Sequence, residues 1–476
     1  MMERTKVHDV PVLRLKIDHS AGELVRSFVR ESLVAEDLFS TNSELLANDS
    51  YHLWRALCAN ESDRYHAHIH VGFVAGSVHA SFVLDGYDPF VEILAEFAKS
   101  ISTGSQFSRR DYGVEGWEIV LSRRLAAESD TTVPVIEVRT EPVDQPILIE
   151  KPRREDAAAI ARCFLAVYGR HYVHAEVFSP KRYWKQVESG ALIPMIARNS
   201  IGTVVGHVAL ERAPGANIAE RGEAVVLPDY RGQGLLERMT ESLTLEALTL
   251  GLEGIFAQPV TVHTFSQRND SRDGMMACAL ELGVRPEQEV PRGVQIPTAG
   301  QRQSLFLMFK FLREPSVRRI YAPKQYHEIL SQIYQSLGAE AAFALPVLEL
   351  TGKSHVVIKM EKSGFGDIRF IRIGPCGSDR LQQIYHDLLD LGVKSLRLSV
   401  PLGDPGAPAL VDVAREIGFF FSGVAPCFED GEDALMMQYL IEPLDIDKLQ
   451  IYADQSKVVA AFVDKDRASL KRVEGS

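Results

Sequence analysis

The chain has 476 residues, of which 46% are apolar and 24% charged, and its formal net charge at pH 7 is −12. This composition is that of a globular protein with about two to four domains. The negative charge argues against a nucleic-acid partner and is compatible with a cationic acceptor such as an amine. No apolar run reaches about 18 residues and the start lacks a signal-peptide core, so we expect a cytoplasmic protein without membrane contact. Five scattered cysteines without a Cys-x-x-Cys pair indicate reduced thiols and no metal site.

Residues 1–145 are predicted to form a separate α/β sandwich. Ser100–Tyr112, rich in Ser, Gly and Arg, is interpreted as a mobile lid or a plain loop. Apolar periodicity and turn residues predict two helices and four strands: helices over Ala21–Glu36 and Ser43–Leu57, and strands over Val12–Ile17, His68–Val74, Ser77–Leu84 and Val133–Arg139.

Three polar residues of the second helix lie four positions apart, at Glu44, Asn48 and His52, and therefore share one face. A carboxylate one turn from an amide oxygen can act as a general base beside a magnesium ligand. The alternative is a solvated polar face. The order of elements and the Glu-x-x-x-Asn-x-x-x-His spacing resemble the ATP-binding fold of histidine kinases and of the anti-sigma-factor serine kinases. That resemblance implies that Glu44 and Asn48 serve catalysis and magnesium binding in an ATP site.

Two further glycine motifs of that family are incomplete in this chain. The second would fall at residues 85–90, Asp-Gly-Tyr-Asp-Pro-Phe, where the glycine is out of register. The third would lie near Gly113 and Gly116, where the glycine pair is not complete. We therefore expect a degenerate domain, which binds a nucleotide or a signalling partner instead of hydrolysing ATP.

Pro-punctuated residues 139–152 indicate a linker, and a second domain is predicted over residues 146–312. Its elements alternate between strand-like and helix-like patterns. The predicted helices are Arg154–Tyr168, Pro180–Ser189, Glu237–Leu250 and Asn269–Leu282, and the predicted strands are Ile147–Glu150, Ile193–Arg198, Val204–Ala213, Ile218–Leu227, Gly254–Val262 and Ser304–Phe311.

The most informative segment is residues 225–236, Val-Val-Leu-Pro-Asp-Tyr-Arg-Gly-Gln-Gly-Leu-Leu, which predicts a strand, a tight turn and the start of a helix. Gly232 and Gly234 permit positive φ and close backbone approach. Amide groups of the turn and of the first helical turn then point toward one site, which suits pyrophosphate oxygens. Arg231 adds a charged donor.

This segment resembles the acyl-CoA-binding motif of the GNAT acyltransferases, Val-x-Pro-x-Tyr-Arg-Gly-x-Gly followed by an apolar and a small residue. Leu236 departs from the motif, because the family has Gly or Ala there. The resemblance implies a GNAT fold and a loop that holds acetyl-CoA. The matching residues are Val226, Pro228, Tyr230, Arg231, Gly232, Gly234 and Leu235, and the loop also contains Leu227, Gln233 and Leu236.

Acyl transfer from a thioester to an amine requires a base and donors for the oxyanion. The backbone of Val226 and Leu227 is expected to hold the thioester carbonyl. Glu220 and Glu223, on the same strand, are candidate bases or else strand-end carboxylates that face solvent. By type, Asn269 matches the residue that contacts pantetheine in the family, although it can equally cap a helix.

The tyrosine that many family members use as a general acid has no counterpart here, since residues 269–283 contain none. His263, Ser266 and Tyr230 are alternative proton donors. Tyr168, His171 and Tyr172 lie where acceptor pockets form in this fold, and they line such a pocket or belong to the core.

From residue 313 the pattern begins again. Residues 413–423 resemble the end of a GNAT domain, but no Arg-Gly-x-Gly loop precedes them. We interpret 313–476 as a degenerate GNAT-like repeat that ends in a polar helical tail over Lys448–Lys471; an unrelated α/β module is the alternative. The other predicted elements are helices over Tyr326–Leu337, Ser378–Leu391 and Ala407–Ile417, and strands over His355–Met360, Asp367–Ile373, Lys394–Val400 and Leu435–Leu440.

The sequence as a whole predicts a multi-domain α/β acyltransferase that transfers an acyl group, most simply acetyl, from acyl-CoA to a small amine or a protein lysine. The competing hypothesis is a regulatory protein that senses CoA or a nucleotide and binds a signalling partner.

Overall fold

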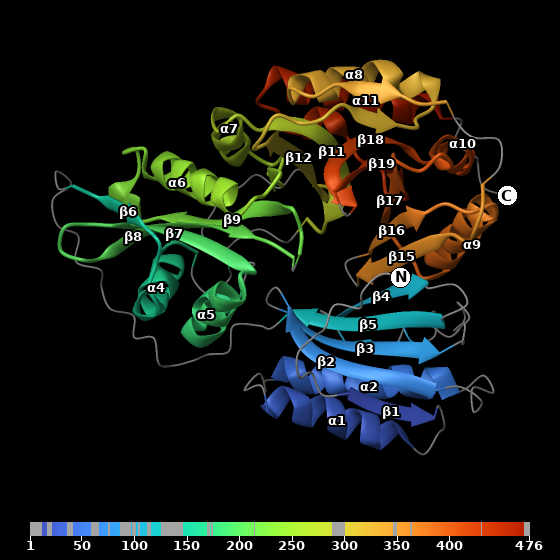
Figure 1. Ribbon diagram of the computed structural model, residues 1–476, viewed down its shortest axis with the longest axis horizontal. Helices are drawn as coiled ribbons and strands as arrows, with labels where there is room; N and C mark the ends of the chain where they lie inside the picture. Colours follow the sequence, from blue (N-terminus) through green and yellow to red (C-terminus); the bar gives the residue numbers. More distant parts are fainter. Residues whose placement is uncertain are drawn as a thin grey trace.

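The computed structural model shows a mixed α/β protein (Figure 1). Its described residues form one 17-stranded sheet and a separate two-stranded sheet. It describes residues 12–16, 21–35, 41–58, 66–74, 77–85, 97, 101–102, 105–111, 116–124, 146–168, 172, 175–213, 215–287, 300–345, 350–361, 364–429 and 431–470.

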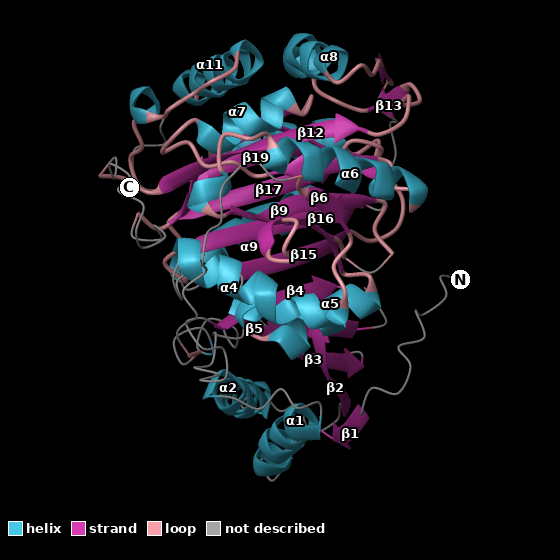
Figure 2. Ribbon diagram, turned by 90° about the vertical axis from the view of Figure 1, so that its left-hand side faces the viewer, coloured by secondary structure: helices cyan, strands magenta, loops and turns pink. Residues whose placement is uncertain are grey.

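The N-terminal part of the sheet is antiparallel, in the order β1-β2-β3-β5-β4. Helices α1 and α2 lie against it at one end of the molecule (Figure 2) and enclose a hydrophobic cluster of their own around Trp54 and Phe82. The sheet does not stop there, because β4 also pairs with β15. The elements are β1 (Val12–Lys16), α1 (Gly22–Ala35), α2 (Thr41–Cys58), β2 (His66–Val74), β3 (Ser77–Asp85), β4 (Ser105–Asp111), β5 (Gly116–Arg124) and β15 (His355–Glu361).

Ser100–Tyr112 was predicted to be a lid or loop, and that prediction is wrong for its second half. Ser105–Asp111 forms β4, which is paired on both sides, to β5 and to β15. Its residues are nearly all polar and lack the apolar alternation that indicates a strand, although its backbone pairs on both sides. The predicted strand Val133–Arg139 and residues 86–90 of the second glycine motif lie outside the described residues. The domain boundaries at 145 and 312 stay predictions.

The central part of the sheet runs in the order β6-β7-β8-β9-β10-β12-β11, and only β9 and β10 are parallel to each other. Helices α4 and α5 cover one face and α6 covers the other (Figure 1). The elements are β6 (Leu148–Glu150), α4 (Ala157–Tyr168), α5 (Pro180–Ser189), β7 (Leu192–Arg198), β8 (Val204–Glu211), β9 (Ile218–Val226), α6 (Leu235–Thr249), β10 (Gly254–Ala257), α7 (Phe265–Arg272), β11 (Met276–Arg285) and β12 (Gln303–Phe311).

The predicted helix Asn269–Leu282 is wrong. A short helix, α7, ends at Arg272, and Met276–Arg285 is the strand β11. Ala, Leu and Glu in this segment favour a helix locally, but β11 pairs with β12 over most of its length and also touches β18. Tertiary pairing has overridden local propensity.

The C-terminal part of the sheet runs in the order β15-β16-β17-β19-β18. Here too only one pair is parallel, β16 with β17, so the succession of pairings is the same as in β8-β9-β10-β12-β11. The elements are β13 (Arg318–Ile320), α8 (His327–Ser336), β14 (Ala341–Phe343), β16 (Phe365–Arg372), α9 (Gly377–Asp390), β17 (Ser395–Pro401), α10 (Ala407–Ile417), β18 (Phe420–Glu429), β19 (Glu432–Leu440) and α11 (Asp454–Ser469).

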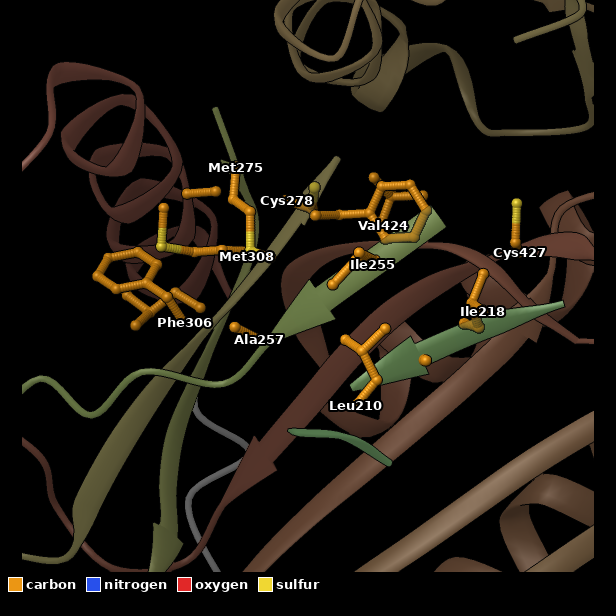
Figure 3. Packing of buried hydrophobic residues seen from close by; sticks show 14 of the residues in the cluster. Leu210, Ile218, Ile255, Ala257, Met275, Cys278, Phe306, Met308, Val424 and Cys427 are labelled. Atoms are coloured by element: carbon orange, nitrogen blue, oxygen red, sulfur yellow. The ribbon is translucent and has the colours of Figure 1, made fainter. Parts of the chain in front are cut away.

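The central and C-terminal parts meet where β11 crosses β18. Ala279 faces Gly423, and the side-chain amide of Gln438 both accepts from the Leu282 amide (2.7 Å) and donates to the Leu282 carbonyl (3.2 Å). Side chains of β10, β12 and β18 belong to one hydrophobic cluster (Figure 3). The two parts therefore share a core.

The tail predicted over Lys448–Lys471 is helical but not simply polar. Helix α11 buries Val459 and Val463 and packs on β11 and β18. Its Asp466 carboxylate accepts from the Phe421 amide and from Arg415 and Tyr326. Among the helices described, none is long and apolar enough to cross a membrane.

Candidate functional site

A cavity of about 680 Å³ opens where β9 and β10 separate. The two strands pair only from Ile218 to Glu220 of β9, opposite Gly254–Phe256. Beyond Glu220, β9 continues beside β8 alone. The cavity occupies the resulting wedge and is lined by β9, the loop after it, the first turns of α6, and α7.

The loop between β9 and α6 has the geometry of an anion site. Pro228–Tyr230 forms one turn of 3-10 helix, and Gly232 and Gly234 have φ values of 79° and 68°. A side chain at Gly232 would meet nothing within 4 Å, so glycine is required there by φ and not by space. Helix α6 begins at Leu235, and its N-cap, Gly234, has no side chain that can cap it. The first amide groups of α6 thus remain for a ligand.

Most of the predicted site residues line this one cavity. They come from β9, from the loop, from α6 and from α7, which the fold brings together around the wedge. Leu227 and Gln233 are not among the lining residues. Those that line it are Glu220, Glu223, Val226, Arg231, Gly232, Gly234, Leu235, Leu236 and Asn269.

Leu227 is not available to hold a carbonyl oxygen, which corrects that prediction. Its amide donates to the Val205 carbonyl (2.9 Å), and its own carbonyl accepts from the Tyr230 amide. Hydrogen-bonded and non-hydrogen-bonded pairs alternate along an antiparallel ladder. Because the Leu227 amide binds the Val205 carbonyl, the neighbouring pair, Gly206 and Val226, is a non-hydrogen-bonded one. The amide of Val226 therefore points away from β8, toward the wedge, while its carbonyl accepts from the Arg231 guanidinium (3.2 Å).

The two candidate carboxylates occupy different positions. Glu220 is half-buried and is the last residue of β9 that pairs with β10. Glu223 is buried, with φ of 48°, in a bulge where Glu223 and Ala224 face the single residue Val208. A non-glycine residue seldom adopts this φ. The bulge brings Glu223 into the cavity wall.

Aromatic residues from α4 and the segment after it form the wall on the side of Glu223. Tyr168 and Tyr172 line the cavity, with ring centroids 4.9 Å apart, and the Tyr168 hydroxyl donates to the Ala224 carbonyl (3.0 Å). Burial raises the pKa of Tyr172 well above its usual range, and the charges of Glu223, Glu211 and Glu176 add to the rise. Negative charge therefore converges on this wall. His171 lies outside the described residues.

The side chain of His207 is hydrogen-bonded to the backbone of the bulge. Its Nδ1 faces the Glu223 carbonyl (2.7 Å), which can only accept, so Nδ1 carries the hydrogen of the neutral ring. The Tyr183 hydroxyl then donates to Nε2 (2.8 Å). Burial lowers the pKa of His207 to about 4. The ring is neutral near pH 7 and fixes the backbone of the bulge.

Asn269 lies within α7 and not at its start, because the N-cap of that helix is Thr264. It lines the cavity beside a buried ionic cluster in which Arg221 binds Asp270 and Asp273, and Lys310 binds Asp273 (2.7 Å). Sequence reasoning missed this cluster, because its partners lie 37 to 52 positions apart along the chain. It ties α7 to β9 and β12.

The three alternative proton donors fare differently. The Tyr230 hydroxyl is buried and accepts from the Asn199 side chain (3.0 Å), so it is turned toward the β7–β8 connection. His263 does not belong to the cavity lining, whereas Ser266 does. The hydroxyl oxygen of Ser266 is itself buried and has no hydrogen-bond partner among the described residues.

In the N-terminal part, Glu44 accepts from Arg26 (3.3 Å) and Asn48 is half-buried on the same helix. The carboxylate with the most contacts is the neighbouring residue, Asp49, which is fully buried and accepts from Ser102 and Ser105. This part of α2 thus has a structural carboxylate next to the predicted magnesium ligand. No cluster of three or more potential metal ligands occurs among the residues with a described position.

The loop before α9 is the C-terminal counterpart of the loop before α6. It contains Gly374, and Gly377 is the first residue of α9. Two amides of this loop are bound by the protein itself: Ile373 donates to the Asp404 carboxylate (2.8 Å) and Gly374 to the Ser354 hydroxyl (3.0 Å). A side chain at Gly374 would lie 2.5 Å from the Gly352 carbonyl oxygen. Two amides of this loop are thus used by acceptors of the protein itself, and the loop packs closely against the segment at Gly352.

Neither a protein-family model nor a curated protein matches this chain. About 35% of the chain is similar in structure to GNAT acetyltransferases. A GNAT acetyltransferase from Staphylococcus aureus Mu50 is 14% identical over 35% of this chain and 100% of its own, with a TM-score of 0.28. The ribosomal-protein-S18-alanine N-acetyltransferase from Escherichia coli is 14% identical over 36% of this chain and 97% of its own, with a TM-score of 0.29.

A putative acetyltransferase from Salmonella typhimurium, solved with acetyl-CoA, is 19% identical over 36% of this chain and 97% of its own, with a TM-score of 0.29. Likenesses at these scores carry no inference about activity. What this chain does must be judged from its own strand order and cavity.

Proposed function

We propose that this protein is an acyl-CoA-dependent N-acyltransferase that transfers an acyl group, most simply acetyl, to a primary amine. The observation that carries the proposal is the wedge between β9 and β10. It has an uncapped helix N-terminus and a two-glycine loop at one end and carboxylates with tyrosines at the other. A single elongated substrate, with a phosphate group at one end and a thioester at the other, would suit both ends of this cavity.

The anion end is built to take pyrophosphate. The amide groups of the 232–236 segment supply donors, and the exposed Arg231 supplies positive charge at the same loop. Asn269 of α7 lies on the lining where the arm of acyl-CoA would pass. Acyl-CoA supplies the thioester, and the wedge-facing amide of Val226 is the backbone donor for its carbonyl oxygen.

The acceptor end suits a cationic amine. The charges of Glu223, Glu211 and Glu176 act on Tyr172, and Glu220 lies opposite Glu211 on the neighbouring strand. Of these glutamates, Glu220 and Glu223 line the cavity together with Tyr168 and Tyr172. Carboxylates attract a protonated amine, and tyrosine faces add cation–π attraction. The amine must lose a proton before it attacks. Glu223, in the buried bulge, is the base that we favour, with Glu220 as the alternative.

Calorimetric titration of the full-length protein with acetyl-CoA tests the anion end. We expect binding in the wild type and a dissociation constant raised about 100-fold in Arg231→Glu, since a charged hydrogen bond is replaced by repulsion. Arg154→Glu, at an equally exposed arginine far from the loop, is the matched control. A panel containing a polyamine, an aromatic amine and a lysine peptide then tests transfer, read as CoA release.

The regulatory alternative is favoured by one observation. Leu236 is a large side chain on the lining of the anion end, where a small residue would leave more room. A protein that binds no acetyl-CoA, while remaining folded, would support that alternative. Titration of the same full-length chain with ATP and magnesium then asks whether Glu44 and Asn48 serve a nucleotide.

A further inference from the structure

We propose that Tyr168 is the proton donor to the departing CoA thiolate; this inference rests on the proposed function. When the amine displaces CoA, the carbon–sulfur bond breaks and its electron pair stays on sulfur. A donor beside the thioester must neutralise that charge. Helix α7, Phe-Ser-Gln-Arg-Asn-Asp-Ser-Arg, offers serine hydroxyls, which are much weaker acids than a phenol, and the hydroxyl of its cavity-lining Ser266 is buried. A better donor therefore has to come from another wall of the wedge.

Tyr168 has the required position. It is the last residue of α4, it lines the cavity, and its hydroxyl donates to the Ala224 carbonyl at 3.0 Å. Ala224 belongs to the β9 bulge and lies two residues before Val226, the residue with the wedge-facing amide. The hydroxyl is therefore held beside the segment of backbone assigned to the thioester, by a neutral bond that a thiolate can displace.

The other hydroxyls and imidazoles near the wedge are less suited. Tyr183 donates to His207, and both side chains are fully buried behind the wall. The Tyr230 hydroxyl is turned to Asn199. His207 is neutral near pH 7 because burial lowers its pKa to about 4, so it has no proton to give. Tyr172 lies deeper among the carboxylates, on the acceptor side.

The step balances without a further reactant. The amine nitrogen forms a bond to the acyl carbon, sulfur leaves with the electron pair, and the Tyr168 proton moves to sulfur. The proton lost by the amine reaches the Tyr168 phenolate through the glutamate base and solvent, so the products are an amide and CoA thiol. Burial raises the pKa of Tyr168, which keeps it protonated before the step, and the nearby charge of Arg231 opposes that rise.

Replacement of the hydroxyl tests the proposal. For Tyr168→Phe we expect kcat to fall about 100-fold or more, which begins at the lower end of the range for a proton donor, with acetyl-CoA affinity within about twofold of the wild type. Tyr385→Phe, which removes a half-buried hydroxyl on α9 far from the cavity, is the control. The thiolate absorbance of bound CoA gives a second readout: the wild type should hold the thiol with a lower pKa than Tyr168→Phe does.

A fluorinated tyrosine at position 168 keeps the shape of the side chain and lowers the phenol pKa. The basic limb of the kcat–pH profile should then move to lower pH, and the same substitution at 385 should leave it in place. An unmoved limb, or full kcat in Tyr168→Phe, would overturn the proposal for Tyr168 alone. A wild type that binds acetyl-CoA and acylates no amine would overturn the proposed function, and this inference with it.

Discussion

At the scale of single residues, the strained bulge at Glu223 places a carboxylate in the wall of the wedge. A residue in the left-handed region costs on the order of 1 kcal/mol or more and persists only when its surroundings enforce it. Here His207 binds the Glu223 carbonyl, and Tyr168 binds that of Ala224. Two side chains from other elements thus hold the bulge that places a carboxylate in the wall.

Glu223→Gln should lower the rate of transfer about 100-fold or more, because the amide cannot take the amine proton. Acetyl-CoA affinity should stay the same, since Glu223 lies at the other end of the wedge from the loop. CoA release and calorimetry measure the two quantities. Glu220→Gln is the matched variant, and a larger fall there than in Glu223→Gln would reassign the base. Glu432→Gln, exposed on β19, is the control.

The buried His207 predicts a pH dependence of stability. Its pKa is about 4 in the folded protein, against about 6.5 in an unfolded chain. Between these values the unfolded state binds the proton and the folded state does not, so stability falls as pH falls from 6.5 toward 4. The loss amounts to about 3 kcal/mol of unfolding free energy.

Denaturant unfolding at several pH values checks this. His207→Gln should have a shallower dependence on pH than the wild type by that amount, and the exposed His52→Gln should not differ from the wild type. Parallel curves for the wild type and His207→Gln would contradict the assignment.

At the scale of elements, the described part of the 17-stranded sheet contains two units in which a helix connects parallel strands, β9-α6-β10 and β16-α9-β17. Only the first leaves its loop open. In the second, Asp404 and Ser354 accept hydrogen bonds from two amides of the loop before α9. The two units thus share a backbone plan, but in the second one two loop amides are bound by the protein itself.

We therefore expect one acyl-CoA per chain in calorimetric titration of the full-length protein. Asp404→Asn should lower the unfolding free energy by about 1–2 kcal/mol, because two amides lose a charged acceptor, and should leave the stoichiometry at one. Two equivalents bound by the wild type would show that the loop before α9 is open to ligand.

At the scale of the whole molecule, all three parts of the chain join one sheet, through β4–β15 and β11–β18. The second junction depends on close approach. Gly423 has φ of 147°, and a side chain there would lie 2.3 Å from the Cα of Ala279. Glycine is needed both for the conformation and for the contact.

Gly423→Ala should destabilise the protein by about 2 kcal/mol or more, since an extra methyl group in a packed junction forces strand and core apart. Gly190→Ala, at a φ of 73° with nothing within 4 Å, carries backbone strain without a clash and should cost about 1 kcal/mol. Thermal unfolding compares them, and an equal effect of the two substitutions would show that the junction is not tightly packed.

Features that depend on neighbouring residues could be predicted from the sequence. The turn at 228–234 and the helix after it require positive φ, a proline and an amphipathic run, which are properties of neighbouring residues, so the loop and most of its cavity-lining residues could be predicted. The fate of Leu227 could not, because its amide is used by Val205 on another strand. Nor could β11, whose alanines and leucines favour a helix until β12 and β18 pair with it.

The sequence by itself determined the motif, the alternation of strands and helices, and the residue types available for chemistry. Only the tertiary structure decided which of them meet: that β9 parts from β10 at Glu220, that a bulge buries Glu223, and that Tyr168 reaches Ala224 across 56 positions of the chain. The physical reason is that φ preferences and periodicity act between neighbours. Hydrogen-bond partners and burial depend on residues that are distant in sequence and are set only when the sheet is assembled.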